Sequence, residues 1–194
     1  MKITRRQLLF GTVAVGTGSA FFFGARRIFK LYSTPNLEKL STYKLAIDAL
    51  AVAVIPSTKD SPGASDVNIA DFIIHAITNC TDKKTQNNFL TGLDNILEHA
   101  IDKYGISVTD CTVDQRIEML LSLEAASSYS QSWIGKVERK LFGDNFIYTL
   151  KRLVVWGYCT SELGATIGLS YDYIPAKFVG DVILKPGQKS WATS

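Results

Sequence analysis

Apolar residues recur at helical spacing through most of the chain. The clearest series, with three- and four-residue steps, is Phe89, Leu93, Ile96, Leu97, Ala100, Ile101 and Tyr104. Gly105 follows this series directly, and a glycine is typical of the residue just beyond a helix C-terminus. The pattern predicts an amphipathic helix over residues 89–104.

Two more helices are predicted before this one. The face of the first is formed by Leu37, Leu40, Ile47, Leu50, Ala51 and Val54, and the face of the second by Ile69, Phe72, Ile73, Ala76, Ile77 and Cys80. Pro56 ends the first helix, because proline has no amide hydrogen to continue it. The segment between them, Ser57–Ser65, is rich in turn-forming residues and is expected to be a loop.

The rest of the chain predicts two further helices and then a loss of pattern. Thr112 and Gln115 have the spacing of a capping box and open a helix that passes into the serine-rich segment 127–132. A fifth helix is expected over 133–158, with a break at Gly135 or Gly143. Beyond Thr160, glycines and prolines interrupt the periodicity, and only 178–184 could form a short strand. The sequence therefore predicts an all-α domain of about five helices with an irregular C-terminal tail.

The first 30 residues have the features of an export signal. Thr4-Arg5-Arg6-Gln7-Leu8-Leu9 is similar to the bacterial twin-arginine motif, with Arg5 and Arg6 as the recognition pair. Leu8 to Ala25 carry no charge, and this stretch of 18 residues is at the short end of what spans a bilayer. We expect residues 1–30 to be a twin-arginine signal or an uncleaved membrane anchor, and residues 31–194 to be a helical domain in the periplasm.

Charge and composition exclude two classes of protein. Hydrophobic residues make up 46% of the chain and charged residues 20%, which is inconsistent with a disordered protein. The net charge is +3, but residues 1–25 hold Lys2, Arg5 and Arg6 and no acid, so the chain beyond residue 25 has 18 bases and 18 acids. A neutral domain lacks the basic surface that binding to phosphate backbones requires, so nucleic acid is not expected as a partner.

The sequence contains no cofactor or metal motif. Gly11, Gly16 and Gly18 lie inside the export segment without the dinucleotide-binding spacing, and no CxxCH or clustered cysteines are present for haem or iron–sulfur ligation. We expect His75 to be a hydrogen-bonded boundary residue and His99 to be solvated, with neither in a catalytic or metal site. After export, Cys80, Cys111 and Cys159 would lie in an oxidising compartment. Whether any of them forms a disulfide stays open.

Three stretches together resemble one protein family. They are Val54-Ile55-Pro56-Ser57-Thr58 with Ser61-Pro62-Gly63-Ala64, then Gly157-Tyr158-Cys159-Thr160-Ser161-Glu162-Leu163-Gly164-Ala165, and then Pro186-Gly187-Gln188-Lys189-Ser190-Trp191-Ala192. They are similar to the gluconate 2-dehydrogenase subunit 3 family. Cys159 departs from the pattern, because another aromatic residue is expected there.

The resemblance implies a small exported helical subunit that holds no cofactor and no catalytic residue of its own. Its expected partner is a large FAD-dependent dehydrogenase of the glucose-methanol-choline class that oxidises a sugar or sugar acid, with a cytochrome c subunit as a common electron acceptor. The small subunit would support folding of the flavoprotein and, through the twin-arginine translocase, its export.

The expected contact with the flavoprotein lies in the second and third stretches and the tail between them. Its candidate residues are Tyr158, Thr160, Ser161, Glu162, Tyr171, Tyr173, Phe178 and Trp191. For the tail aromatics, filling of the core and contact with a partner are both open. Two other classes also stay open: a stand-alone exported hydrolase whose site is assembled in space, and a membrane-anchored helical binding module.

Overall fold

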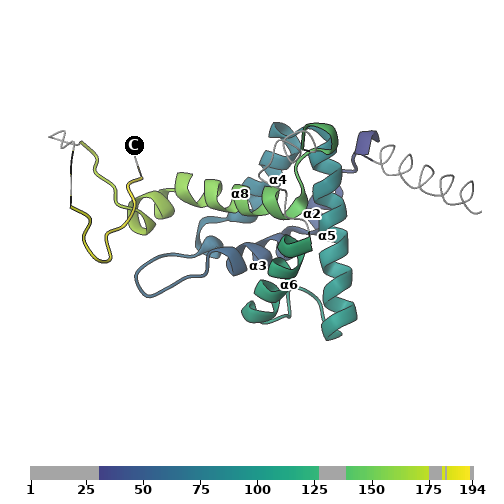
Figure 1. The fold of residues 1–194 in the computed structure, drawn as a ribbon, viewed down its shortest axis with the longest axis horizontal. Helices are drawn as coiled ribbons and strands as arrows, with labels where there is room; N and C mark the ends of the chain where they lie inside the picture. The colour runs from purple at the N-terminus through teal and green to yellow at the C-terminus, as the bar shows by residue number, and fades with distance from the viewer. Residues whose placement is uncertain (1–30, 127–138, 175–180, 182, 193–194) are drawn as a thin grey trace, which may run out of the picture.

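Helices form the body of the protein (Figure 1). In the computed structural model, the residues described are 31–126, 139–174, 181 and 183–192, and no named strand occurs among them. The helical segments are α2 (Lys39–Thr42), α3 (Lys44–Val54), η1 (Ala64–Val67), α4 (Ile69–Cys80), α5 (Lys83–Tyr104), α6 (Val113–Ala126), α8 (Phe146–Thr160) and the π-helical turn η2 (Gly164–Gly168). The predicted all-α class is confirmed for this part of the chain.

The predicted helices are present, with two corrections to their extent: the first helix is divided, and the third begins earlier than predicted. The first helix divides at Tyr43 into α2 and α3, and the Tyr43 hydroxyl donates to Asp94 Oδ1 of α5 at 2.6 Å. This hydrogen bond, together with burial, raises the pKa of Tyr43 above its ordinary value. The predicted break in the fifth helix is confirmed at Gly143, whose φ is 78°, and the chain becomes helical again as α8 after Asn145 caps it. Gly135 lies outside the described residues.

Helix α5 begins six residues before its predicted start. Its cap is Asp82, whose side chain accepts from the Thr85 amide at 2.9 Å. The first two turns are polar, yet Gln86 and Asn87 are buried, and Gln86 Nε2 donates to Ile77 O at 2.9 Å. A search for apolar periodicity misses turns of this kind, because their buried side chains are amides satisfied by main-chain carbonyls.

The predicted helix ends at Gly105 and Thr112 are confirmed. Gly105 has a φ of 70° and its amide donates to Ile101 O at 2.8 Å, which closes α5. At the start of α6, the Thr112 amide donates to Gln115 Oε1 at 2.8 Å, and the Gln115 amide donates to Thr112 Oγ1 at 3.3 Å. This reciprocal pair is the capping box that the sequence indicated.

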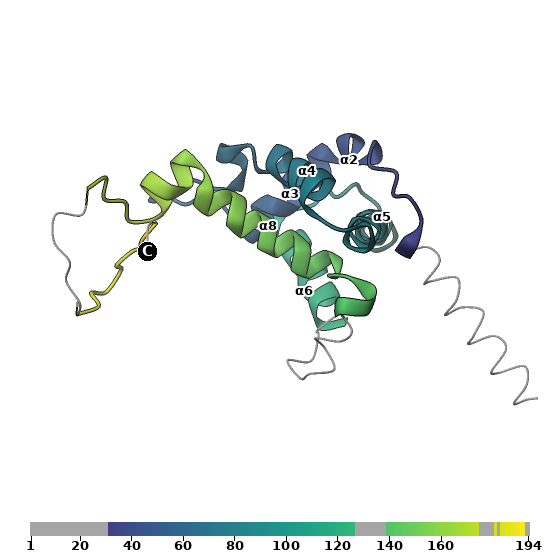
Figure 2. The same cartoon turned by 90° about the horizontal axis from the view of Figure 1, so that it is seen from above.

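Helix α8 lies at the centre of the fold. It runs from the C-terminal tail to the end of the body that holds α5 and α6 (Figure 2), and it packs against α3, α4, α5 and α6. Leu150, Leu153 and Val154 of α8 are fully or almost fully buried. At the crossing with α5, the rings of Phe146 and Phe89 lie 5.3 Å apart, and a Cβ added to Gly92 would collide with Phe146.

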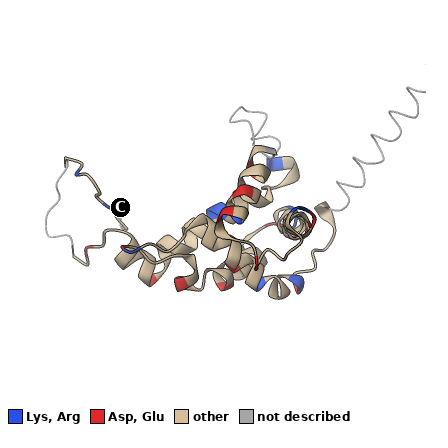
Figure 3. Ribbon diagram, turned by 90° about the horizontal axis from the view of Figure 1, so that it is seen from below, with Lys and Arg blue, Asp and Glu red and all other residues tan. Residues whose placement is uncertain are grey.

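Charged residues of both signs are interspersed over the helices (Figure 3). Lys103 Nζ lies 2.7 Å from Glu118 Oε1 and joins α5 to α6. Hydrogen bonds from Lys103 and Tyr104 lower the pKa of Glu118. Within the described ranges, no helix is both long enough and apolar enough to span a membrane.

The predicted strand over 178–184 does not form at its described positions. Residues 181, 183 and 184 are irregular, whereas 178–180 and 182 lie outside the described residues. The tail instead makes a single-residue parallel bridge between Ser170 and Trp191. This bridge holds two segments that are far apart in sequence beside the end of α8.

We predict that Gly92→Ala destabilises the protein, although alanine is the better helix former by about 1 kcal/mol. The added methyl group would meet Phe146, and overpacking of this kind costs about 1–3 kcal/mol. Thermal unfolding should show a lowered midpoint. The matched control is Asn95→Ala at an exposed position of α5, which should leave the midpoint unchanged or slightly raised. A Gly92→Ala variant as stable as Asn95→Ala would contradict the close approach of α5 and α8.

Candidate functional site

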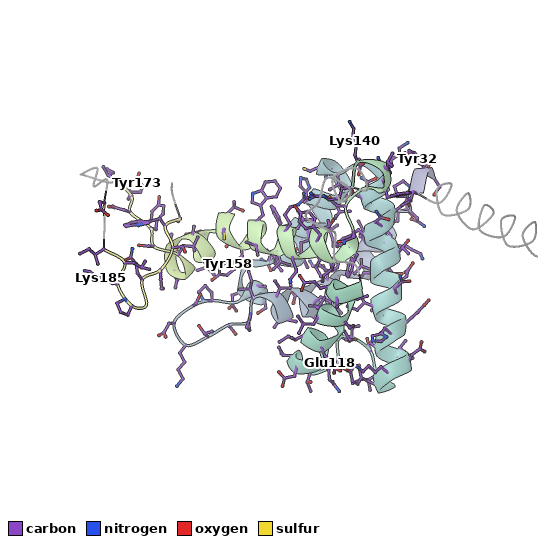
Figure 4. The ribbon with its side chains drawn as sticks, in the orientation of Figure 1. Tyr32, Glu118, Lys140, Tyr158, Tyr173 and Lys185 are labelled. Atoms are coloured by element: carbon purple, nitrogen blue, oxygen red, sulfur yellow. The ribbon has the colours of Figure 1, made fainter. Side chains whose placement is uncertain are left out.

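The three family-like stretches meet at one end of the molecule, around Tyr158 of α8. The Tyr158 side chain is 6% exposed and lies against the loop over residues 57–63 (Figure 4). Its hydroxyl donates to Pro62 O at 2.8 Å and lies 2.9 Å from the Ser61 hydroxyl. We call this arrangement of loop 57–63, η2 and residues 186–192 around Tyr158 the Tyr158 junction.

The second stretch closes over Tyr158 through Ser161 and two glycines. Ser161 Oγ donates to Tyr158 O at 2.7 Å and accepts from the Gly164 amide at 3.0 Å, which fixes the turn into η2. A Cβ at Gly164 would collide with the Tyr158 carbonyl, and one at Gly168 would collide with the Tyr158 hydroxyl. The turn can therefore pass this close to the tyrosine only with glycine at both positions.

The third stretch joins the junction through Lys189. Lys189 Nζ donates to the carbonyl of Ile167 in η2 and lies 3.4 Å from the carbonyl of Asp60 in the loop. The Ser170 amide donates to Ser190 O, and the Ala192 amide donates to Ser170 O, both at 2.8 Å. Residues 189–192 are thus bound to η2 and to the loop through main-chain atoms.

The tail between these contacts exposes large apolar side chains. Tyr171 is 45% exposed, Tyr173 82% and Trp191 58%, so none of the three fills the core. Phe178, the remaining tail aromatic predicted at the interface, lies outside the described residues. We call the following set the tail surface: Tyr171, Tyr173, Ile174, Ile183, Leu184 and Trp191.

Sequence reasoning missed three members of the tail surface and placed one interface candidate differently. Ile174, Ile183 and Leu184 are 70%, 88% and 79% exposed. The sequence did carry a signal for these three residues. An apolar residue in a segment without helical or strand periodicity does not belong to the buried face of a helix or strand, so exposure could have been predicted. Tyr158, by contrast, is in the core, where it positions the loop.

The other predicted interface residues lie where α8 passes into η2. Thr160 and Glu162 are exposed, and Ser161 is half-buried. The Thr160 hydroxyl donates to Trp156 O at 2.8 Å within its own helix. Trp156 is itself 52% exposed and packs edge-on against Phe72 of α4, with ring centroids 5.7 Å apart. This tryptophan is a further exposed aromatic residue, on α8 and outside the tail surface.

A polar pocket of about 270 Å³ lies where the end of α4 and the start of α5 meet residues 139–152. It is lined by Cys80, Thr81, Asp82, Thr85, Arg139, Gly143, Asp144 and Arg152. Burial raises the pKa of Asp82, but hydrogen bonds from Thr85 and the charge of Lys84 outweigh it and hold that pKa below its ordinary value. The carboxylate therefore stays ionised as the cap of α5.

The histidines and cysteines do not gather into a site. His75 makes the predicted hydrogen bond, with its Nδ1 atom 3.2 Å from Asn79 Nδ2, but it is exposed and not at the boundary of the core; His99 is exposed, as predicted. Cys80, Cys111 and Cys159 are free thiols that are exposed, buried and half-buried, respectively. Among the described residues, His, Cys, Asp and Glu form no group of three that could hold a metal ion.

Comparison with known proteins gives one match. The sequence profile described as gluconate 2-dehydrogenase subunit 3 matches residues 43–176, which is more than half of the chain. No curated protein and no solved structure matches the chain. The matched range includes loop 57–63, Tyr158 and η2, and it ends before the third stretch.

We predict that Tyr158→Phe increases the mobility of the Tyr158 junction without leaving a cavity in the core. The ring remains in place, but the part-buried hydrogen bonds to Pro62 and Ser61 are lost, and each typically contributes about 0.5–1.5 kcal/mol. Hydrogen–deuterium exchange should rise in residues 57–63 and 164–170. Tyr171→Phe, at an exposed tyrosine of the same end, is the control and should leave exchange there unchanged. Equal exchange in the wild type and the Tyr158→Phe variant would show that the hydroxyl does not hold the loop.

Proposed function

The chain belongs to the gluconate 2-dehydrogenase subunit 3 family, and from this we propose that it is the non-catalytic small subunit of an exported FAD-dependent dehydrogenase complex. The family description is that of a subunit, which places a member within a larger assembly. The single observation that supports this proposal best is the family match over residues 43–176.

The expected partner is a large flavoprotein of the glucose-methanol-choline class that oxidises a sugar or sugar acid. FAD and the catalytic groups belong to that flavoprotein, and a cytochrome c subunit receives the electrons. In this proposal the chain contributes a binding surface and no catalytic groups. It binds the flavoprotein, supports its folding and supplies an export signal to the complex.

The tail surface suits the role of a docking site. Tyr173 and Trp191 are rings with a polar handle, and aromatic residues of this kind dominate the energetics of many protein interfaces. Ile183 and Leu184 are 88% and 79% exposed, and water around them would be released on binding. The Tyr158 junction holds both ends of the segment against the body, so less chain entropy is lost when the partner binds.

Export of the complex follows from the signal at the N-terminus. The twin-arginine route carries proteins that have already folded, so a subunit bound in the cytoplasm could bring its flavoprotein through. Arg5 and Arg6 are the residues that the translocase would recognise. They lie outside the described residues, and the proposal for them stands on the sequence motif. The complex would then work in the periplasm, released from or anchored to the inner membrane.

We predict that Tyr173→Ala weakens association with the flavoprotein at least tenfold, because truncating an anchoring aromatic costs about 2 kcal/mol or more. Ile183→Ser with Leu184→Ser should have a similar effect. The measurement is co-purification from a strain that expresses both subunits. Since these side chains are 79–88% exposed, the thermal midpoint of the isolated subunit should not change.

The control for this experiment is Tyr32→Ala, at an exposed aromatic of the opposite end. This variant should co-purify as the wild type does. Unchanged association for both tail variants would show that the tail surface is not part of the interface. A wild-type chain that never co-purifies with a flavoprotein would contradict the proposed role as a subunit.

We predict that Arg5→Lys with Arg6→Lys blocks export. Arginine and lysine carry the same charge but differ in shape and in their hydrogen-bond donors, so a receptor for the arginine pair should reject the lysines. Cell fractionation should find the variant, together with its flavoprotein, in the cytoplasm. Periplasmic accumulation at the wild-type level would show that the pair is not the export signal.

A further inference from the structure

Loop 57–63 leaves the body through a narrow neck. The Ala64 amide donates to Ile55 O at 2.9 Å and joins the two sides of this neck. A Cβ added to Gly63 would collide with the main chain of Ser57, so the two sides approach as closely as glycine permits. The loop therefore has a fixed direction, and it extends from the body toward the end that holds the tail (Figure 1).

The outer part of the loop is also fixed. The Thr58 amide donates to Ser61 O at 2.9 Å and closes a tight turn at the loop tip. The Tyr158 hydroxyl donates to one loop carbonyl at 2.8 Å, and Lys189 Nζ lies 3.4 Å from another. Loop 57–63 is thus bound through main-chain atoms to α8 and to the third family-like stretch, which are far away in sequence.

The loop tip contributes little to the core. Residues 56–60 are exposed, including Lys59 and Asp60 in the turn. Among the residues that the structure describes, neither of these two side chains belongs to an ion pair. Holding a loop in one conformation costs conformational entropy, and exposed side chains give no burial in return. Loops that a scaffold positions in this way commonly carry binding residues, so a contact outside the chain would account for the tip.

We propose that Lys59 and Asp60 are specificity-determining residues for the flavoprotein, an inference that rests on the proposed function. The loop tip lies beside the tail surface, because Lys189, whose Nζ atom contacts Asp60 O, is two residues from Trp191. A standard interface covers about 800 Å² on each partner. A flavoprotein that covers Trp191 would therefore also reach the loop tip.

The loop tip offers a partner an order of charges and no net charge. Lys59 and Asp60 have opposite signs, so together they add nothing to the charge of the chain. A matching surface presents an acid opposite Lys59 and a base opposite Asp60, whereas a surface with the reverse order is repelled. Complementarity of this kind selects among partners more than it raises affinity.

The test exchanges the two charges, as Lys59→Asp with Asp60→Lys, in the full chain. The wild type and this variant are expressed together with a tagged copy of the flavoprotein. Mass spectrometry then compares their ratio in the purified complex with their ratio in the lysate. The variant should be depleted about tenfold in the complex, because like charges replace both attractive contacts. The thermal midpoint of the isolated variant should not change, since the loop is held through main-chain atoms.

The matched control makes the same kind of exchange on α2, as Glu38→Lys with Lys39→Glu. Both residues are exposed, and α2 lies away from the tail (Figure 1). A second control, Lys59→Arg with Asp60→Glu, changes the side chains of the loop tip but keeps the order of their charges. Both controls should enter the complex within about twofold of the wild type.

Equal recovery of the charge-exchange variant and the wild type would overturn the proposal. An equal depletion of either control would also overturn it, because the order of charges at the loop tip would then not be what the flavoprotein recognises. Depletion together with a lowered thermal midpoint would assign the loop to the stability of the fold. A flavoprotein that carries neither the wild type nor any variant would instead contradict the proposed function, so the two failures are distinguishable.

Discussion

Helix α8 packs against α3, α4, α5 and α6, and its buried face is shared among all four. A helix with this many neighbours must meet each of them at the distance that its side chains allow, and the contacts at its two ends set the rest. At the N-terminal end, Gly92 makes room for Phe146 against α5. At the C-terminal end, Tyr158 is enclosed by loop 57–63 and η2. The path of the chain on either side of α8 depends on these two places.

The parts of the fold that could be read from the sequence are those where burial is achieved by apolar side chains. The helices over 69–80 and 89–104, the capping box at Thr112 and the stop at Gly105 all follow from spacing. The first turns of α5 could not be read in this way, because Gln86 and Asn87 are buried as hydrogen-bonded amides. Amide burial requires a partner carbonyl from elsewhere in the chain, and no local pattern encodes that partner.

The same distinction applies to the candidate site. The sequence identified the stretches that converge and the aromatic tail, but it assigned Tyr158 and Tyr173 to one surface. In the structure, Tyr158 is 6% exposed and Tyr173 82%. The difference arises from what surrounds each ring: loop 57–63 and two glycines enclose Tyr158, whereas Tyr173 lies beyond the last turn of η2. Since these neighbours come from distant parts of the sequence, residue type alone could not separate a positioning tyrosine from an exposed one.

The contacts that attach the C-terminal residues to the body are made to main-chain atoms. Lys189 binds the carbonyls of Ile167 and Asp60, Tyr158 binds the carbonyl of Pro62, and Ser170 pairs with Ser190 and Ala192 through amides and carbonyls. A carbonyl is the same whatever side chain its residue bears. Evolution could therefore alter the side chains of Asp60 and Ile167, and with them the outer face offered to another protein, while the attachment of the tail persists. The subunit could in this way be adapted to a different partner protein by substitutions that leave its own fold unchanged.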